Sequence, residues 1–172
     1  GCGAIVADAR YDGALGTVGI GIVFGLIIMA MIYATGHLSG AHINPAVTIA
    51  FTLSRHFSPR DALAYVAAQC TGASAGAFLL LAMWSDKPGN LGATVPTVGT
   101  GTALGYEIVL TAFFLIVIMG ATRATAAAGF APIAIGLTLT FHRYFAHRAF
   151  NQNGELVAHC KRSSLMRKTP AR

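Results

Sequence analysis

Residues 39–48 read Ser-Gly-Ala-His-Ile-Asn-Pro-Ala-Val-Thr and follow directly on a long apolar run. Non-helical backbone at membrane depth is tolerated only where it lines a water-filled cavity or is buried in protein. Pro45 suits the first position of a helix, and Asn44 is a preferred cap just before it. The helix that follows is expected to be short, from Ala46 to about Leu53. A loop that feeds a capped half-helix between two membrane spans predicts a pore.

The composition is that of a membrane protein. Of 172 residues, 55% are hydrophobic, only 10% are charged and 20 are glycine. Charged residues are absent from 13–36 and from 62–85, and each stretch is longer than the ~20 apolar residues that a membrane helix needs. The sequence therefore predicts an all-α membrane protein. We expect full spans at about Gly13–Ala34, Asp61–Trp84, Thr102–Thr122 and Gly129–Phe141, with Gly1–Val6 as the last turns of a further helix and Asp8–Asp12 as a polar connection.

The net charge of +6 comes from one segment of the chain. Basic and acidic side chains cancel over residues 1–141, whereas residues 142–172 carry the whole surplus, with Glu155 as their one acid. A basic patch suits nucleic acid or anionic lipid, but this one is confined to a segment unlike the rest, so we expect no nucleic-acid partner. We divide the chain into a membrane domain, 1–141, and an aberrant basic tail, 142–172, which we expect to be disordered.

Metal binding and catalysis find no support in the sequence. The three cysteines are scattered without the spacing of metal ligands. His37 and His42 could be read as a metal pair, but no third ligand lies near them in the sequence. There is no nucleophile elbow, phosphate-binding glycine loop or carboxylate pair. We therefore expect no cofactor, no metal and no enzymatic activity.

Three stretches carry a resemblance to a known family. Residues 36–48, Gly-His-Leu-Ser-Gly-Ala-His-Ile-Asn-Pro-Ala-Val-Thr, are similar to the first pore loop of the aquaporin (major intrinsic protein) family. Residues 129–140, Gly-Phe-Ala-Pro-Ile-Ala-Ile-Gly-Leu-Thr-Leu-Thr, resemble the fifth helix of bacterial aquaporin-Z-type water channels, and 65–69, Tyr-Val-Ala-Ala-Gln, the third. The resemblance covers about 1–141. It implies an aquaporin-like helical bundle with re-entrant half-helices, of which about four of six full spans are present.

The resemblance also implies roles for the residues of the loop. Water that crosses a membrane must keep hydrogen bonds along an otherwise apolar wall. The pore motif is Asn44, Pro45 and Ala46, in which the Asn44 side-chain amide acts as a donor at the positive end of the half-helix. The backbone carbonyls that form a ladder of acceptors are those of Gly40, Ala41, His42 and Ile43. Donors at mid-pore orient water and interrupt a proton wire, and the positive field opposes cations.

Four further positions are matched to the aquaporin family's pore or to its support. Phe24 matches the aromatic that narrows the outer mouth of water channels, where glycerol-conducting relatives tend to carry Trp. A histidine from the fifth helix should stand opposite Phe24, and His142 is one residue early for that place. Glu107 sits where the fourth helix of the family carries a buried acid that accepts loop N–H groups. The family's filter arginine has no aligned counterpart, and Arg143 and Arg148 are the nearest candidates.

Three functions remain open at this point. The first is a passive transmembrane water channel. The second is a glycerol or small neutral solute facilitator of the same family. The third is a non-conducting membrane remnant, truncated or frame-shifted, since a back-translation of 142–155 with chosen codons can be read in another frame as a segment similar to the family's second loop. The family implies water or small neutral solutes and membrane lipid as partners, a homotetramer, and a multi-pass protein of a bacterial plasma membrane.

Two expectations concern the chain as written. The family plan puts residues 55–60 and Arg123 on the cytoplasmic side, a thin positive-inside bias. Nearly all of a first helix, a second Asn-Pro-Ala loop and a sixth helix have no counterpart here. Unsatisfied backbone groups cost several kcal/mol each in hydrocarbon. We therefore expect residues 1–172 to keep an aquaporin-like half without selective water permeability.

Overall fold

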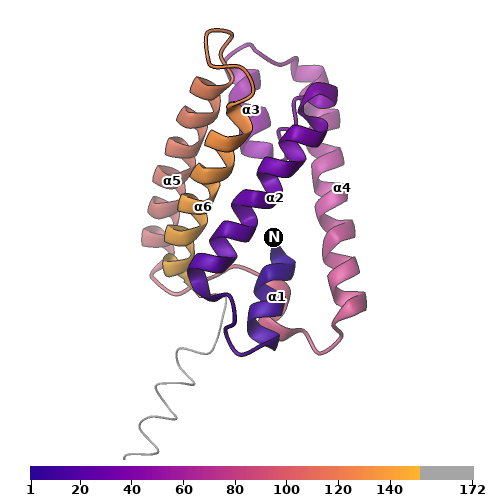
Figure 1. Cartoon of the computed structure of the whole chain (residues 1–172), viewed down its shortest axis with the longest axis vertical. Coiled ribbons are helices and arrows are strands. Elements are labelled where there is room, and N and C mark those ends of the chain that lie inside the picture. The colour runs from indigo at the N-terminus through magenta and orange to yellow at the C-terminus, as the bar shows by residue number, and fades with distance from the viewer. Residues whose placement is uncertain (152–172) are drawn as a thin grey trace, which may run out of the picture.

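The computed structural model describes residues 1–151, with the backbone alone for 147–151, as a set of helices that run roughly side by side (Figure 1). The helices are α1 Cys2–Arg10, α2 Gly16–Ser39, α3 Pro45–Leu53, α4 Pro59–Met83, α5 Thr100–Ala121 and α6 Ala131–Ala149. A 3₁₀ turn, η1, spans Pro88–Gly92. Two short strands, β1 Val95–Pro96 and β2 Phe150–Asn151, pair antiparallel.

Three of the described helices have the length and apolar character of membrane spans, namely α2, α4 and α5. Four full spans were expected. The fourth, α6, is present as a helix but is not among the three that qualify by length and composition. Its second half carries His142 and Arg143 in place of apolar residues, which lowers its hydropathy. The chain is a helical membrane protein with three clear spans in the part that the structure describes.

The N-terminal segment departs from the expected polar connection at Asp8–Asp12. Helix α1 continues through Asp8 to Arg10. Asp8 is only 2% exposed, and its Oδ1 accepts hydrogen bonds from the backbone N–H groups of Leu15 and Gly16, each at 2.8 Å. Those N–H groups belong to the first turn of α2, where intrahelical acceptors are lacking. Asp8, inside α1, therefore caps the start of the next helix.

Helices α2 and α6 lie side by side and cross at small residues (Figure 1). A Cβ on Gly25 would collide with the carbonyl oxygen of Gly136 and with the Thr140 side chain, so only glycine fits at this point. Gly21, one turn earlier, also faces Thr140, but a Cβ there would lie 3.2 Å from the Thr140 carbonyl oxygen, a tight contact and not a collision. Small residues four apart let helix backbones approach closely in membranes. Helix α5 packs on the other side of α6, whereas α4 has no buried residue and touches mainly α3.

The last described helix passes the expected boundary at residue 141. The fourth span was expected to end at Phe141, yet α6 continues to Ala149. Residues 142–149 contain neither glycine nor proline. Phe145 packs on Phe141 one turn earlier, with 4.6 Å between ring centroids, and Ala146 is 4% exposed. Helical structure therefore replaces the start of the expected tail, while residues 152–172 of that tail lie outside the described residues.

Candidate functional site

The loop between α2 and α3 has an irregular backbone. Gly40 ends α2 in the left-handed conformation, with φ of 77°, and its N–H bonds the Gly36 carbonyl. Ala41 and Ile43 also have positive φ, 44° and 54°. A non-glycine residue in this region costs on the order of 1–2 kcal/mol, so the surrounding contacts must hold the loop. This stretch is the one expected to supply the acceptor ladder, and its helical hydrogen bonding is broken as that role requires.

Asn44 caps α3 with its side chain. Its Oδ1 accepts the backbone N–H of Ala46 at 2.8 Å, and Pro45 occupies the first helical position. Helix α3 then runs to Leu53, as the sequence predicts. An N–H group bonds only the oxygen of the Asn44 amide, so this bond fixes the orientation of the amide. The Nδ2 group, which carries both hydrogens, is left to face outward from the cap.

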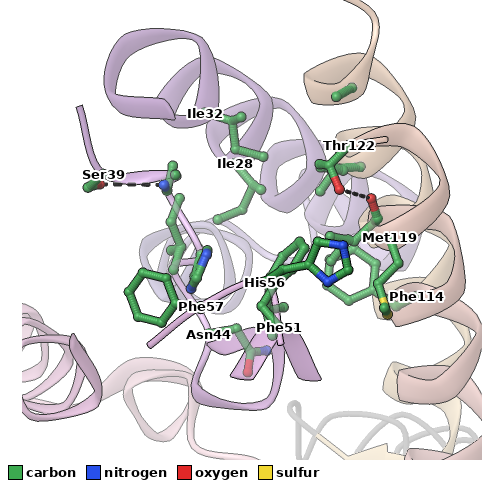
Figure 2. Close-up of a pocket in the computed structure, with 18 of the residues that line it drawn as sticks. Ile28, Ile32, Ser39, Asn44, Phe51, His56, Phe57, Phe114, Met119 and Thr122 are labelled. Atoms are coloured by element: carbon green, nitrogen blue, oxygen red, sulfur yellow. Dashed lines mark hydrogen bonds between the residues drawn. The ribbon is translucent and has the colours of Figure 1, made fainter. Parts of the chain in front are cut away.

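A cavity of about 960 Å³ lies over this loop. Figure 2 shows Ile28 and Ile32 of α2 across the cavity from Phe114 of α5, with Asn44 just before the first residue of α3. The whole lining is Ile28, Ile32, Ser39, Gly40, Ala41, His42, Ile43, Asn44, Val47, Phe51, His56, Phe57, Phe114, Ile118, Met119, Thr122, Arg123, Ala124, Ala131, Ile135 and Leu139. The wall is mostly apolar with a few polar groups, which is the usual make-up of a binding cavity.

The cavity continues the main hydrophobic core. Val47 of α3 clusters with Phe114 and Ile118 of α5 and with Ile135 of α6, and all four are buried and line the cavity. Val47 therefore packs the half-helix α3 against α5 and α6. His56 and Arg123, expected on one side of the membrane, both line the cavity. We therefore predict that the cavity opens toward the cytoplasmic side.

Helix α4 holds the loop from the other side. The Tyr65 hydroxyl donates to Ser39 at 3.1 Å and accepts the His42 backbone N–H at 3.3 Å. The His42 ring stacks on Phe51, with centroids 4.9 Å apart and planes 20° apart, and meets the Phe57 ring edge-on at 4.8 Å. These contacts immobilise His42, which the sequence alone allowed to be read with His37 as a metal pair. Among the described residues, no group of three His, Cys, Asp or Glu side chains could hold a metal ion.

Phe24 faces Arg143 in the structure. The Arg143 guanidinium carbon lies 4.0 Å from the centroid of the Phe24 ring, which is cation–π geometry. His142, the residue expected opposite Phe24, lies instead with its Nε2 3.8 Å from a carboxylate oxygen of Glu107. The structure therefore brings Phe24 together with Arg143, and Glu107 together with His142. Within the described residues no loop N–H is recorded on Glu107, the contact expected of it.

The Phe24–Arg143 pair lies one helical turn beyond the cavity. On α2, Ile32 and Ile28 line the cavity and Phe24 follows four residues further along the same face. On α6, Ile135 and Leu139 line it and Arg143 follows at the same spacing. The cavity residues of α5 and α6 were not predicted from the sequence. Their spacing of four was visible, but helices that are apolar all round do not show which face is turned inward.

The chain matches a known protein family over most of its length. The family model described as "Major intrinsic protein" matches residues 1–150. The chain is similar to the probable aquaporin NIP4-2 of Arabidopsis thaliana, with 40% identity over 147 residues, 85% of this chain and 52% of the relative. It is also similar to proteins named Aquaporin Z from Brucella melitensis, 41% identical over 151 residues, and from Photorhabdus laumondii, 40% identical over 152 residues. Each alignment with these two covers 81% of this chain and 66% of the relative. The chain thus spans between half and two thirds of the length of the relatives it matches.

Proposed function

Because the chain belongs to the major intrinsic protein family, we propose that it conducts water passively across a membrane, with the cavity over Asn44 as an aqueous vestibule. Irregular backbone at membrane depth needs water or protein around it, and the loop at 40–43 lines the cavity. The wall opposite is apolar, so water binds weakly there and can move on. This combination of polar loop and apolar wall supports conduction rather than tight binding of a ligand.

The observation that carries this proposal is the orientation of the Asn44 amide. Its oxygen accepts the Ala46 N–H, which turns the oxygen toward α3 and leaves the NH₂ group to donate hydrogen bonds to a water molecule. The positive end of the α3 dipole adds to the same polarity. A water oxygen therefore turns toward Asn44 and both its hydrogens point away, which interrupts a hydrogen-bonded proton wire. The same field opposes cations.

Water is favoured over glycerol and other neutral solutes by the Phe24–Arg143 pair. An aromatic ring with a guanidinium 4.0 Å from its centroid would narrow the route beyond the cavity and present hydrogen-bond donors, which suit a single water better than the larger glycerol molecule. The remaining partners are also proposals. The exposed apolar faces of α2, α4 and α5 suit lipid or further copies in a homotetramer, and the bacterial relatives support a bacterial plasma membrane.

Stopped-flow light scattering of proteoliposomes that contain the full chain tests the proposal. Under a gradient of an impermeant osmolyte, we expect faster shrinkage than for protein-free liposomes. Under a glycerol gradient, we expect no acceleration of glycerol entry. Glycerol entry together with water flux would support the solute facilitator instead. No acceleration in either gradient would contradict conduction by this chain.

A second candidate, the one expected of residues 1–172 from the sequence alone, is a membrane protein that keeps the half-pore but does not conduct. The specific observation in its favour is again the Arg143 guanidinium over Phe24, because the pair lies one helical turn beyond the cavity, where it would block passage. Cavity-facing positions would then react with water-soluble reagents from one side, while water flux stays at the level of empty liposomes. The two measurements together separate the candidates.

A further inference from the structure

The ionisable groups in the interior of the bundle gather in one place. Away from their ends, the membrane-length helices α2, α4 and α5 carry one charged side chain, that of Glu107 on α5. Helix α6 carries His142 and Arg143 in its second half. The Nε2 atom of His142 lies 3.8 Å from a carboxylate oxygen of Glu107, and the charge of Glu107 acts on Arg143 as well. We call these three residues the charge cluster.

The charge cluster interrupts a contact between α5 and α6 that is otherwise apolar. Ala103 and Leu110 flank Glu107 at spacings of four and three residues, which places all three on one face of α5. Both flanking residues are buried with Ala146 of α6. The side chains of His142 and Glu107 are 13% and 37% exposed. Glu107 is therefore turned toward α6, with apolar contacts before and after it.

The glycine crossing of α2 and α6 accounts for the direction of Arg143 but not for its charge. Gly136 and Thr140 face α2, and Arg143 follows Thr140 on the same side of α6, toward Phe24. A guanidinium is always charged in proteins, and the Arg143 Nε atom is buried without a hydrogen-bond partner in the described part of the chain. Ionisable side chains inside a membrane are costly and pair with one another. Glu107 is the carboxylate in position to offset this charge.

We propose that Glu107 is a positioning residue, whose negative charge keeps His142 and Arg143 inside the bundle and so holds Arg143 over Phe24. Removing one partner of a buried charge pair leaves an uncompensated charge, whereas replacing all partners by apolar residues is often neutral. Without the charge of Glu107, the second half of α6 would move outward to bring its cations to water. The narrowing of the route by Arg143 rests on the proposed function, whereas the charge pairing does not.

The accessibility of position 146 tests the proposal. Ala146 is 4% exposed and follows His142 by one turn of α6. It is replaced by cysteine in the full chain, with the native cysteines changed to serine, and the protein is treated in liposomes with a charged thiol reagent on both sides. We expect a protected thiol when Glu107 is present, and a reaction on the order of tenfold faster in Glu107→Gln. Glutamine keeps an oxygen that accepts N–H groups, so this substitution reports the charge alone.

Two further variants separate charge from packing. The triple variant combines Glu107→Gln with His142→Leu and Arg143→Leu, which leaves no cation in the cluster, so protection should return. Asp61→Asn removes an exposed acid from the first turn of α4 and should leave position 146 protected. Cys2 also acts on Arg143, but the serine in its place carries no negative charge.

Unchanged protection in Glu107→Gln would overturn the proposal, and so would a triple variant that reacts as fast as Glu107→Gln. Thermal unfolding in detergent, with alanine kept at position 146, gives a second measurement that does not depend on the new cysteine. We expect Glu107→Gln to unfold at a lower temperature than both the unaltered chain and the triple variant. Neither measurement needs water flux, so failure of this proposal and failure of the proposed function are distinguishable.

Discussion

Gly25 of α2 and Gly136 of α6 face each other so closely that a Cβ on Gly136 would lie 2.8 Å from the Gly25 carbonyl oxygen. These two helices supply both sides of the apolar stripe that leads from the cavity to Phe24 and Arg143. Without their close crossing the stripe would widen, and the cavity over Asn44 would open to lipid.

Replacing Gly25 with leucine is expected to force α2 and α6 apart. Overpacking costs about 1–3 kcal/mol, and more is expected here because the colliding atoms include backbone. Thermal unfolding in detergent should show a lower midpoint. The control is Gly72→Ala on α4, where a Cβ meets nothing within 4 Å. If both variants unfold at the same temperature as the unaltered chain, the close crossing is not what holds the two helices together.

Substitutions of Asn44 distinguish its role as the cap of α3 from its role as a hydrogen-bond donor to water. In Asn44→Asp the carboxylate still accepts the Ala46 N–H, so stability should change by less than about 0.5 kcal/mol. The donors to water are lost, so we expect a proton leak in pH-gradient liposomes. In Asn44→Ala the cap is lost as well, at a cost of about 1 kcal/mol. If the Asp variant leaks protons no faster than the unaltered chain, the result would argue against the donor role.

Asp8 is expected to stabilise the start of α2. Asp8→Ala removes the acceptor for the N–H groups of Leu15 and Gly16, and leaving buried donors unsatisfied costs about 1–3 kcal/mol. Asp8→Asn keeps an oxygen at the same place and should cost less. Hydrogen exchange of the Leu15 and Gly16 amides is the direct measurement. Faster exchange is expected in the alanine variant, and unchanged protection there would rule out the cap.

Arg143 is expected to narrow the route beyond the cavity so that water fits but a thiol reagent does not. Arg143→Ala removes the guanidinium from the face of Phe24. In a chain with an Ile28→Cys substitution, the new thiol should then react with impermeant reagents from both sides of the membrane, whereas with Arg143 in place it reacts from one side. Arg143→Lys is the control for charge without the flat guanidinium. One-sided reaction in the alanine variant would show that the pair is not the barrier.

The loop could be predicted from the sequence more fully than the helices around it. Asn44 as a cap and Pro45 as the first helical residue are local chemistry, and α3 begins and ends where that chemistry indicates. The partners of His142 and Arg143 could not be found this way. Successive residues on a helix point about 100° apart, so an offset of one residue turns His142 to Glu107 and Arg143 to Phe24. The burial of Asp8 depends on a contact with the next helix, which no local pattern reveals.

The cavity over Asn44 is expected to hold water. Two neighbours on α2 distinguish a water-filled cavity from a lipid-facing surface: Ile28, which lines the cavity, and Ile27, which is 45% exposed on the outside. Each is replaced by cysteine in a chain whose Cys2, Cys70 and Cys160 are serine, and each variant is treated in liposomes with a charged thiol reagent. We predict rapid modification of the Ile28→Cys variant and little of Ile27→Cys, which faces lipid. Equal rates, or a faster reaction at position 27, would contradict an aqueous cavity.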